Sequence, residues 1–244
     1  MFKIGKKHGR KWGMSIINSQ KRYEADMEEY RFFLTNMKAI PYHGEYFDFY
    51  LNLLSKELRY SSLLEINRYH TKNRYLYPFH CMDDRLLFGK EQKYEEVEID
   101  IRENNLISEP WNHTRYADIL YAIQKNGFKY QITNHMAYYY DGLNITCAYN
   151  GLHSLGAGVY WGNGKIKAQR INVTSLFEVV DAYNDLSFGY NEKNIRKKFE
   201  DKGMIIPAKL KKSLEDRFYG TDYRLILIYE LSKRRYLEMK ESRM

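Results

Sequence analysis

The sequence of 244 residues is poor in cysteine, with only Cys81 and Cys147. These two cysteines form neither the spacing of a metal site nor a disulfide framework. The chain also lacks any run near the roughly 20 apolar residues that a bilayer span needs, and no apolar segment of a signal peptide follows its basic N-terminus. These absences argue against a disulfide-stapled secreted domain and against a membrane protein. We therefore expect a reduced, cytoplasmic protein with no membrane partner.

Aromatic residues and positive charge are abundant instead. Aromatic residues make up 16% of the chain, including 24 tyrosines, and tyrosine serves cores, interfaces and base-stacking surfaces alike. The net charge is +8, and residues 1–22 contain seven basic residues and no acidic one. A second basic stretch runs from Lys193 to Lys212. Such stretches either bind a polyanion, for example nucleic acid, or form solvated faces.

The first third of the chain has the periodicity of helices. Apolar residues recur at spacings of three and four in two stripes, which are separated by Pro41 and Gly44. The stripes consist of Tyr23, Met27, Tyr30, Leu34 and Met37, and of Phe47, Tyr50, Leu54 and Leu58. We expect residues 1–92 to form a helical region that is either a packing layer or the binding surface for a protein partner.

Residues 93–178 mix helical and strand periodicity, which predicts an α+β core of strands and short helices. The clearest strand has Val97, Ile99 and Ile101 alternating with charged residues. The expected elements are a strand over 94–102, a helix through 116–123 that stops at Gly127, a strand over 128–133, a strand over 143–149, a helix over 153–161 and a strand over 166–173.

Residues 179–244 are expected to return to helix. Pro207 is well placed as a first helical residue. The apolar run 225–231 fits either a buried helix or a buried strand, because periodicity alone does not separate the two. Basic residues at 233–235 favour the C-terminus of a helix.

The most informative stretch joins a predicted strand to the helix over 153–161. It contains Asn150-Gly151, the pair His153-Ser154, and Gly156. Free N–H groups at a helix start suit phosphate, and glycine lets a ligand approach the backbone. His153 would then donate to a phosphate oxygen or act as a general acid, and Ser154 would hydrogen-bond a phosphate or a metal-bound water. The alternative is a plain strand-to-helix turn with Ser154 as its cap.

A second candidate lies just before the helix that stops at Gly127. Asn112 and His113 precede Arg115, whose guanidinium can clamp a phosphate through two hydrogen bonds. Asn112 or Thr114 can instead cap the helix. A positive charge in the first helical turn opposes the helix dipole, so a neighbouring anion would compensate it.

Three histidines, His113, His135 and His153, fall within the predicted core. Their spacing matches no metal-ligand signature, and no nearby cysteine or close-set carboxylate completes a site. Ser154 also lacks the surroundings of a nucleophile elbow. We therefore expect neither a protein-bound metal site nor a Ser-His-Asp triad.

Taken together, these two elements resemble the ParB/sulfiredoxin-like superfamily. Members have a Pro-x-x-Arg element before a helix, and here Pro110 and Arg115 lie at that place. Members also have a Gly-x-His-Arg turn followed by alanine-rich residues, and here Gly151-Leu152-His153-Ser154 with Ala157 lies there. The resemblance covers roughly residues 95–175. Within the superfamily, the chain resembles bacterial ParB-like proteins with an Asn-His-Ser turn.

The resemblance implies a nucleotide site with ATP or CTP and Mg²⁺, and activities that include phosphoryl transfer, nucleotide-gated DNA clamping and nucleic-acid cleavage. Arg115 would face a phosphate, and Gly151 and His153 would form the phosphate turn. Two departures stand out, because Ser154 replaces the usual Arg and Leu152 replaces the usual acid. The first removes a bidentate phosphate donor and the second a metal contact.

The sequence thus predicts a ParB-like α+β core at 93–178 with helical additions at 1–92 and 179–244. The predicted function is the binding of a nucleotide or phosphate, with Mg²⁺-dependent hydrolysis of an NTP or nucleic acid as the activity that the family implies. The predicted site residues are His153 and Ser154 as catalytic groups and Asn112, His113, Arg115, Asn150, Gly151 and Gly156 around the phosphates. The alternatives are a non-catalytic nucleic-acid-binding module and a protein-interaction protein with a vestigial site.

Overall fold

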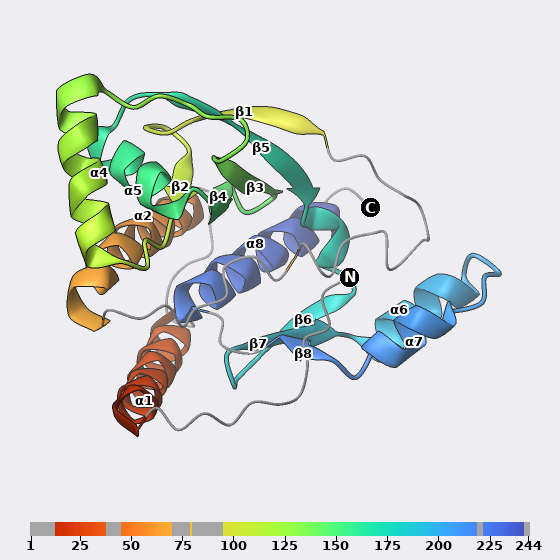
Figure 1. Cartoon of the computed structure of the whole chain (residues 1–244). Coiled ribbons are helices and arrows are strands. Elements are labelled where there is room, and N and C mark those ends of the chain that lie inside the picture. The colour runs from red at the N-terminus through yellow and green to blue at the C-terminus, as the bar shows by residue number, and fades with distance from the viewer. Residues whose placement is uncertain (1–12, 38–44, 70–78, 80–94, 219–221, 242–244) are drawn as a thin grey trace.

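The computed structural model describes residues 13–37, 45–69, 79, 95–218 and 222–241 (Figure 1). Its described helices are α1 (Gly13–Met37), α2 (Glu45–Tyr69), α4 (His113–Asn126), α5 (Leu152–Trp161), α6 (Glu192–Glu200), α7 (Ala208–Ser213) and α8 (Tyr223–Glu241). The described strands are β1 (Glu96–Asp100), β2 (Asn105–Ile107), β3 (Met136–Asp141), β4 (Ile145–Asn150), β5 (Lys165–Asn172), β6 (Val180–Tyr183), β7 (Ser187–Tyr190) and β8 (Arg217–Phe218). The α+β class that the sequence predicts is therefore confirmed.

The strands form two sheets. The first has the order β1-β5-β3-β4-β2, with β3 parallel to β5 and β2 parallel to β4. The β1–β5 and β3–β4 pairs are antiparallel. The second sheet, β6-β7-β8, is antiparallel throughout.

Helices cover both faces of the first sheet. Because side chains alternate along a strand, Ala137 and Ala148 pack against α5, whereas Tyr138 and Cys147 face the opposite side and join the core that contains α8. Figure 1 shows α8 running between the two sheets, and α4 packs on α5. The helix α2 contacts both α8 and β2.

Buried polar groups fix α2 and α5 at the edge of this sheet. Arg59 of α2 donates to the carbonyls of Ile101, at 2.8 Å, and Arg102, at 3.3 Å. The hydroxyl of Ser108, just after β2, donates to the carbonyl of Leu152 at 2.6 Å. The Arg59 bonds hold α2 against the segment between β1 and β2, and the Ser108 bond sets where α5 begins relative to β2.

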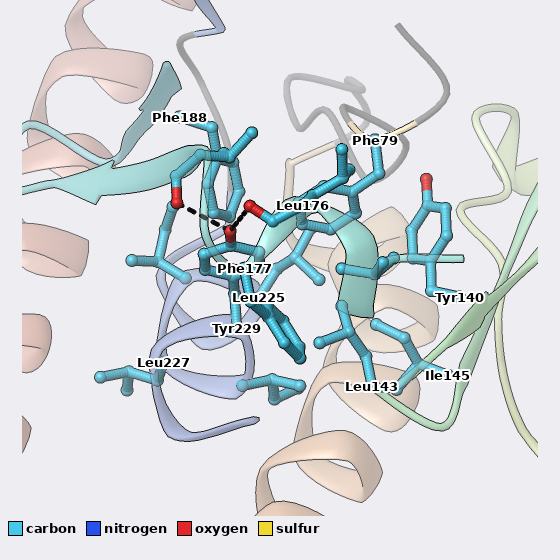
Figure 2. Packing of buried hydrophobic residues seen from close by; sticks show 14 of the residues in the cluster. Phe79, Tyr140, Leu143, Ile145, Leu176, Phe177, Phe188, Leu225, Leu227 and Tyr229 are labelled. Carbon is cyan, nitrogen blue, oxygen red and sulfur yellow. Dashed lines mark hydrogen bonds between the residues drawn. The ribbon is translucent and has the colours of Figure 1, made fainter. Parts of the chain in front are cut away.

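Tyr229 of α8 lies at the centre of the larger core (Figure 2). Its ring contacts the rings of Phe79, Phe177 and Phe188, with centroid distances of 5.3, 5.3 and 5.0 Å. Its hydroxyl donates to the carbonyl of Val180 at 2.9 Å, and the carbonyl of Leu176 lies 3.3 Å away. One side chain therefore links α8 to the chain that leads into the second sheet.

Most of the periodic segments form the elements predicted for them. The two apolar stripes lie on α1 and α2, and the breaks at Pro41 and Gly44 lie outside the described residues. Gly127 ends α4 with φ of 72° and ψ of 169°, and Gly162 ends α5 in the left-handed conformation, with φ of 71° and ψ of 20°.

Four expectations are wrong. Residues 128–133 form no strand; the strand is β3, which begins at Met136 after a turn. Residues 179–244 are not wholly helical, because they contain the second sheet. The helix α8 continues to Glu241, so the basic residues at 233–235 do not mark its end, and Pro207 is the residue before α7 rather than its first residue.

Replacing Tyr229 by Phe keeps the ring and removes the hydroxyl, so we expect a loss of about 1 kcal/mol in the free energy of unfolding. Tyr229→Ala also removes the ring and leaves a cavity, with an expected cost of about 3–5 kcal/mol. Urea denaturation measures both costs. Similar costs for the two variants would contradict a central role for the ring.

Candidate functional site

The start of α5 leaves backbone donors without acceptors in the helix. Gly151 precedes the helix in a left-handed conformation, with φ of 68° and ψ of 26°, and no side chain caps this end. The helical ladder begins where the N–H of Leu155 donates to the carbonyl of Gly151 at 2.9 Å. The N–H groups of residues 152–154 therefore have no acceptor within α5.

Glycine is required at position 151 by crowding as well as by conformation. A Cβ atom there would lie 2.7 Å from the carbonyl oxygen of Asn134 and 2.8 Å from Cδ2 of His135. The segment that leads into β3 therefore packs directly against the turn between β4 and α5. This contact holds residues 134–135 beside the start of α5.

The start of α4 is tied to α5. Asn112 caps α4, because its side-chain oxygen accepts from the N–H of Arg115 at 2.9 Å. The N–H of Asn112 donates to Nε2 of His153 at 3.1 Å. The capping role considered for Asn112 is confirmed, and its backbone also orients the predicted His153.

This bond determines the tautomer of His153. Because Nε2 accepts a hydrogen bond, the proton of the neutral ring is on Nδ1. Burial, and then the positive charge of Arg115, lower the pKa of His153 below its usual value. The ring is therefore held neutral near pH 7, with Nδ1–H as the donor that it can offer a ligand.

His135 and Ser154 form a second hydrogen-bonded chain. The N–H of Gln131 donates to Nδ1 of His135 at 3.0 Å, so the ring proton is on Nε2 and is directed to the hydroxyl of Ser154, 2.8 Å away. That hydroxyl donates in turn to the carbonyl of Gly151 at 3.0 Å. A ring that already carries its proton on Nε2 does not act as a base toward Ser154. The arrangement joins the 131–135 segment to α5 rather than preparing a nucleophile.

A pocket of about 580 Å³ lies over these groups, between α4, residues 127–135 and the β4–α5 turn. Five of the predicted site residues line it, namely Arg115, Asn150, Gly151, His153 and Ser154. Sequence reasoning missed other lining residues, among them Trp111, Lys129, Asn134, His135 and Tyr149. Lys129, Asn134 and His135 are remote in sequence from both predicted elements, so nothing in the sequence places them beside the turn.

The other three predicted residues do not line the pocket. Asn112 is the cap of α4, and His113 is the exposed first residue of that helix. At Gly156 a Cβ atom would lie 2.9 Å from Cγ of Pro110 and 3.0 Å from Cδ2 of Leu63. Gly156 therefore serves close packing of α5 against its neighbours rather than the approach of a ligand.

The charge of the pocket is positive. Arg115 and Lys129 line it, whereas no Asp or Glu does so among the described residues. Within that part of the chain neither cation forms an ion pair. The described residues also contain no group of three or more His, Cys, Asp or Glu side chains that could hold a metal ion. The arrangement therefore favours an anion held by protein donors.

These features define an α+β protein with a basic pocket at the N-terminus of a helix. The chain belongs to the family described as "Family of unknown function (DUF6710)", which it matches over residues 13–233. Comparisons with curated proteins and with solved structures find no match. The resemblance to the ParB/sulfiredoxin-like superfamily stays a prediction.

No helix in the described part of the chain is long and apolar enough to cross a membrane.

Gly151→Ala should destabilise the fold more than Gly162→Ala. Both glycines have positive φ, so each alanine costs about 1–2 kcal/mol. A Cβ atom at Gly162 meets nothing within 4 Å, whereas one at Gly151 overlaps backbone, and we expect about 1–3 kcal/mol more there. Thermal and urea unfolding measure the difference. Equal costs would contradict the crowding at the turn.

Acid should weaken the fold partly through His135. Burial lowers the pKa of His135 from its ordinary 6.5, so the unfolded chain takes up this proton at a higher pH than the folded one. The stability that the neutral ring contributes is present above the unfolded pKa and is lost as the pH falls toward the folded pKa. We expect the free energy of unfolding to fall between about pH 7 and pH 5, and to fall less in His135→Gln. The same pH dependence in both proteins would contradict this.

Proposed function

We propose that this protein binds a phosphate-bearing small molecule of the nucleotide class in the pocket between α4 and α5. One observation carries the proposal. The uncapped start of α5 opens into a pocket that contains Arg115 and Lys129 and, among the described residues, no carboxylate. Backbone donors, a helix dipole and two cations converge on one volume, and phosphate is the anion that suits this combination.

The pocket residues supply complementary donors. The N–H groups of residues 152–154 would bind phosphate oxygens directly. Arg115 would add a bidentate contact, since guanidinium matches phosphate geometry. Nδ1–H of His153 is a further neutral donor, and Lys129 contributes a charge at the rim. Asn112 supports this set by orienting the ring of His153 through its N–H.

The size and lining of the pocket support a nucleotide rather than phosphate alone. About 580 Å³ is within the range of small-molecule sites and far exceeds one phosphate group. Trp111, half exposed, offers an aromatic ring beside the cationic groups. Such rings stack on bases. The resemblance to the ParB/sulfiredoxin-like superfamily, carried by Arg115, Gly151 and His153, supports the same ligand class.

The residues present do not fit a magnesium ion held by the protein. Mg²⁺ prefers carboxylate oxygens, and the described lining of the pocket contains none. The acid that the superfamily turn would supply is Leu152 here. We therefore propose binding and derive no hydrolytic step through the metal.

Isothermal titration calorimetry with ATP and CTP, in the presence and absence of Mg²⁺, tests this proposal. Arg115→Gln removes a charged phosphate donor and should weaken binding about 10-fold to 100-fold. Lys125→Gln is the matched control, because Lys125 is an exposed cation on the same helix that does not line the pocket. It should change the affinity less than about 2-fold.

The absence of binding by either nucleotide or by inorganic pyrophosphate would overturn the proposal. Equal weakening by Arg115→Gln and Lys125→Gln would also overturn it, because the ligand would then respond to overall charge and not to the pocket.

A further inference from the structure

A second basic surface lies at the other end of the molecule, on α6, α7 and the loop between them. We call residues 192–213 the basic hairpin. Its sequence contains eight basic residues and three acidic ones, Glu192, Glu200 and Asp201. The basic residues are Lys193, Arg196, Lys197, Lys198, Lys202, Lys209, Lys211 and Lys212. Figure 1 shows α6 and α7 beside the second sheet, away from α4 and α5.

The large apolar side chains of the two hairpin helices are buried in the core. Ile195 and Phe199 of α6 and Leu210 of α7 are buried in the same cluster as α8. The outward surfaces of both helices are therefore polar and charged. This distribution differs from that of a helix that lies in a membrane surface, whose apolar face stays available to lipid.

Four lysines of the hairpin are free to meet an external anion. Lys193 and Lys197 of α6 and Lys211 and Lys212 of α7 are exposed. Within the part of the chain that the structure describes, none of the four forms an ion pair. By contrast, Arg196 is paired with Glu192 on the same helix.

The positive surface continues from α6 onto α8. A groove of about 400 Å³ lies between the two helices, and Lys197, Lys198, Lys233 and Lys240 line it. Part of this charge is neutralised within the protein, because Lys233 pairs with Asp181 and Lys240 with Glu178. Two carboxylates, Glu178 and Asp201, also line the groove, and Lys197 continues its positive charge onto the exposed surface of α6.

The loop of the hairpin adds an apolar tip. Gly203 turns the chain with φ of 61°, and the next two residues, Met204 and Ile205, are 45% and 92% exposed. Lys202 and Lys209 flank this tip in the sequence. An exposed apolar side chain between cationic residues is the combination with which proteins contact a groove of a duplex while they hold its phosphates.

From this charge distribution we infer that the basic hairpin binds a nucleic-acid duplex. The exposed lysines contact successive phosphates of the backbone, and Ile205 contacts a groove. A duplex complements a surface of repeated, uncompensated charges, because its phosphates are regularly spaced. The interface is separate from the pocket at α5 and does not rest on nucleotide binding there.

Fluorescence anisotropy with a labelled DNA duplex of mixed sequence tests this interface. We expect binding by the full chain that weakens steeply between about 50 and 200 mM salt. The double variant K193Q/K197Q should weaken binding and reduce the slope of log K against log salt by about 2, because each lysine lost removes about one phosphate contact. An RNA duplex of the same sequence shows whether the sugar is read as well.

The matched control is K165Q/K167Q. These lysines of β5 have side chains that are 63% and 53% exposed, and the double variant changes the net charge equally. We expect it to leave the salt slope unchanged. Ile205→Ala should lower the affinity at every salt concentration without changing the slope, because it removes an apolar contact and no phosphate contact.

Three results would overturn the inference. The first is no binding of either duplex at low salt. The second is an equal loss of slope in K193Q/K197Q and K165Q/K167Q, which would assign the attraction to net charge. The third is binding to anionic phospholipid vesicles in place of the duplexes, with Ile205→Ala releasing the protein from them.

Discussion

The close contact at Gly151 is the constraint on which the candidate site depends. The chain leaves β4 at Asn150, turns through the single left-handed residue Gly151 and starts α5 at Leu152. The carbonyl of Asn134 and the ring of His135 occupy the position that a side chain would need. Because nothing larger than a hydrogen atom fits, the residue before α5 is glycine, and residues 134–135 lie directly against it. Glycine has no side chain that could cap the helix, so the start of α5 is left uncapped toward the pocket.

Hydrogen bonds then fix the surroundings of that turn. His135 links Gln131 to Ser154, and the N–H of Asn112 links α4 to His153. Both rings are neutral with a defined tautomer, since each accepts a backbone N–H on one nitrogen. His135 and His153 therefore serve as connectors between segments. The uncompensated charge of the pocket comes from Arg115 and Lys129.

The sequence predicted elements whose residues show one regular periodicity. The alternation around Ile99 gave β1, and the apolar stripes gave α1 and α2. The strand β3 was missed because its run of three tyrosines contacts both faces of the sheet and shows no alternation. The run at 225–231 was ambiguous because α8 lies between two sheets, so it has no polar stripe there. Strands of two to four residues, such as β6 to β8, are too short for periodicity to detect.

The site was predictable only as far as it is local in sequence. Arg115 and the residues from Asn150 to Ser154 could be found because helix starts and glycine turns have recognisable residues. Lys129 and His135 could not, because the tertiary contact at Gly151 brings them to the pocket. Gly156 was assigned to the ligand since the sequence does not show that Pro110 and Leu63 pack against it.

The central claim is that the start of α5 holds a phosphate, and backbone amide resonances report on it directly. We predict that titration of ¹⁵N-labelled protein with inorganic pyrophosphate shifts the amide signals of Leu152, His153 and Ser154 in a saturable manner, because phosphate oxygens would accept from these N–H groups. The amide of Gly162, at the opposite end of α5, should not move. Saturable binding that leaves the three amides unshifted would contradict the account.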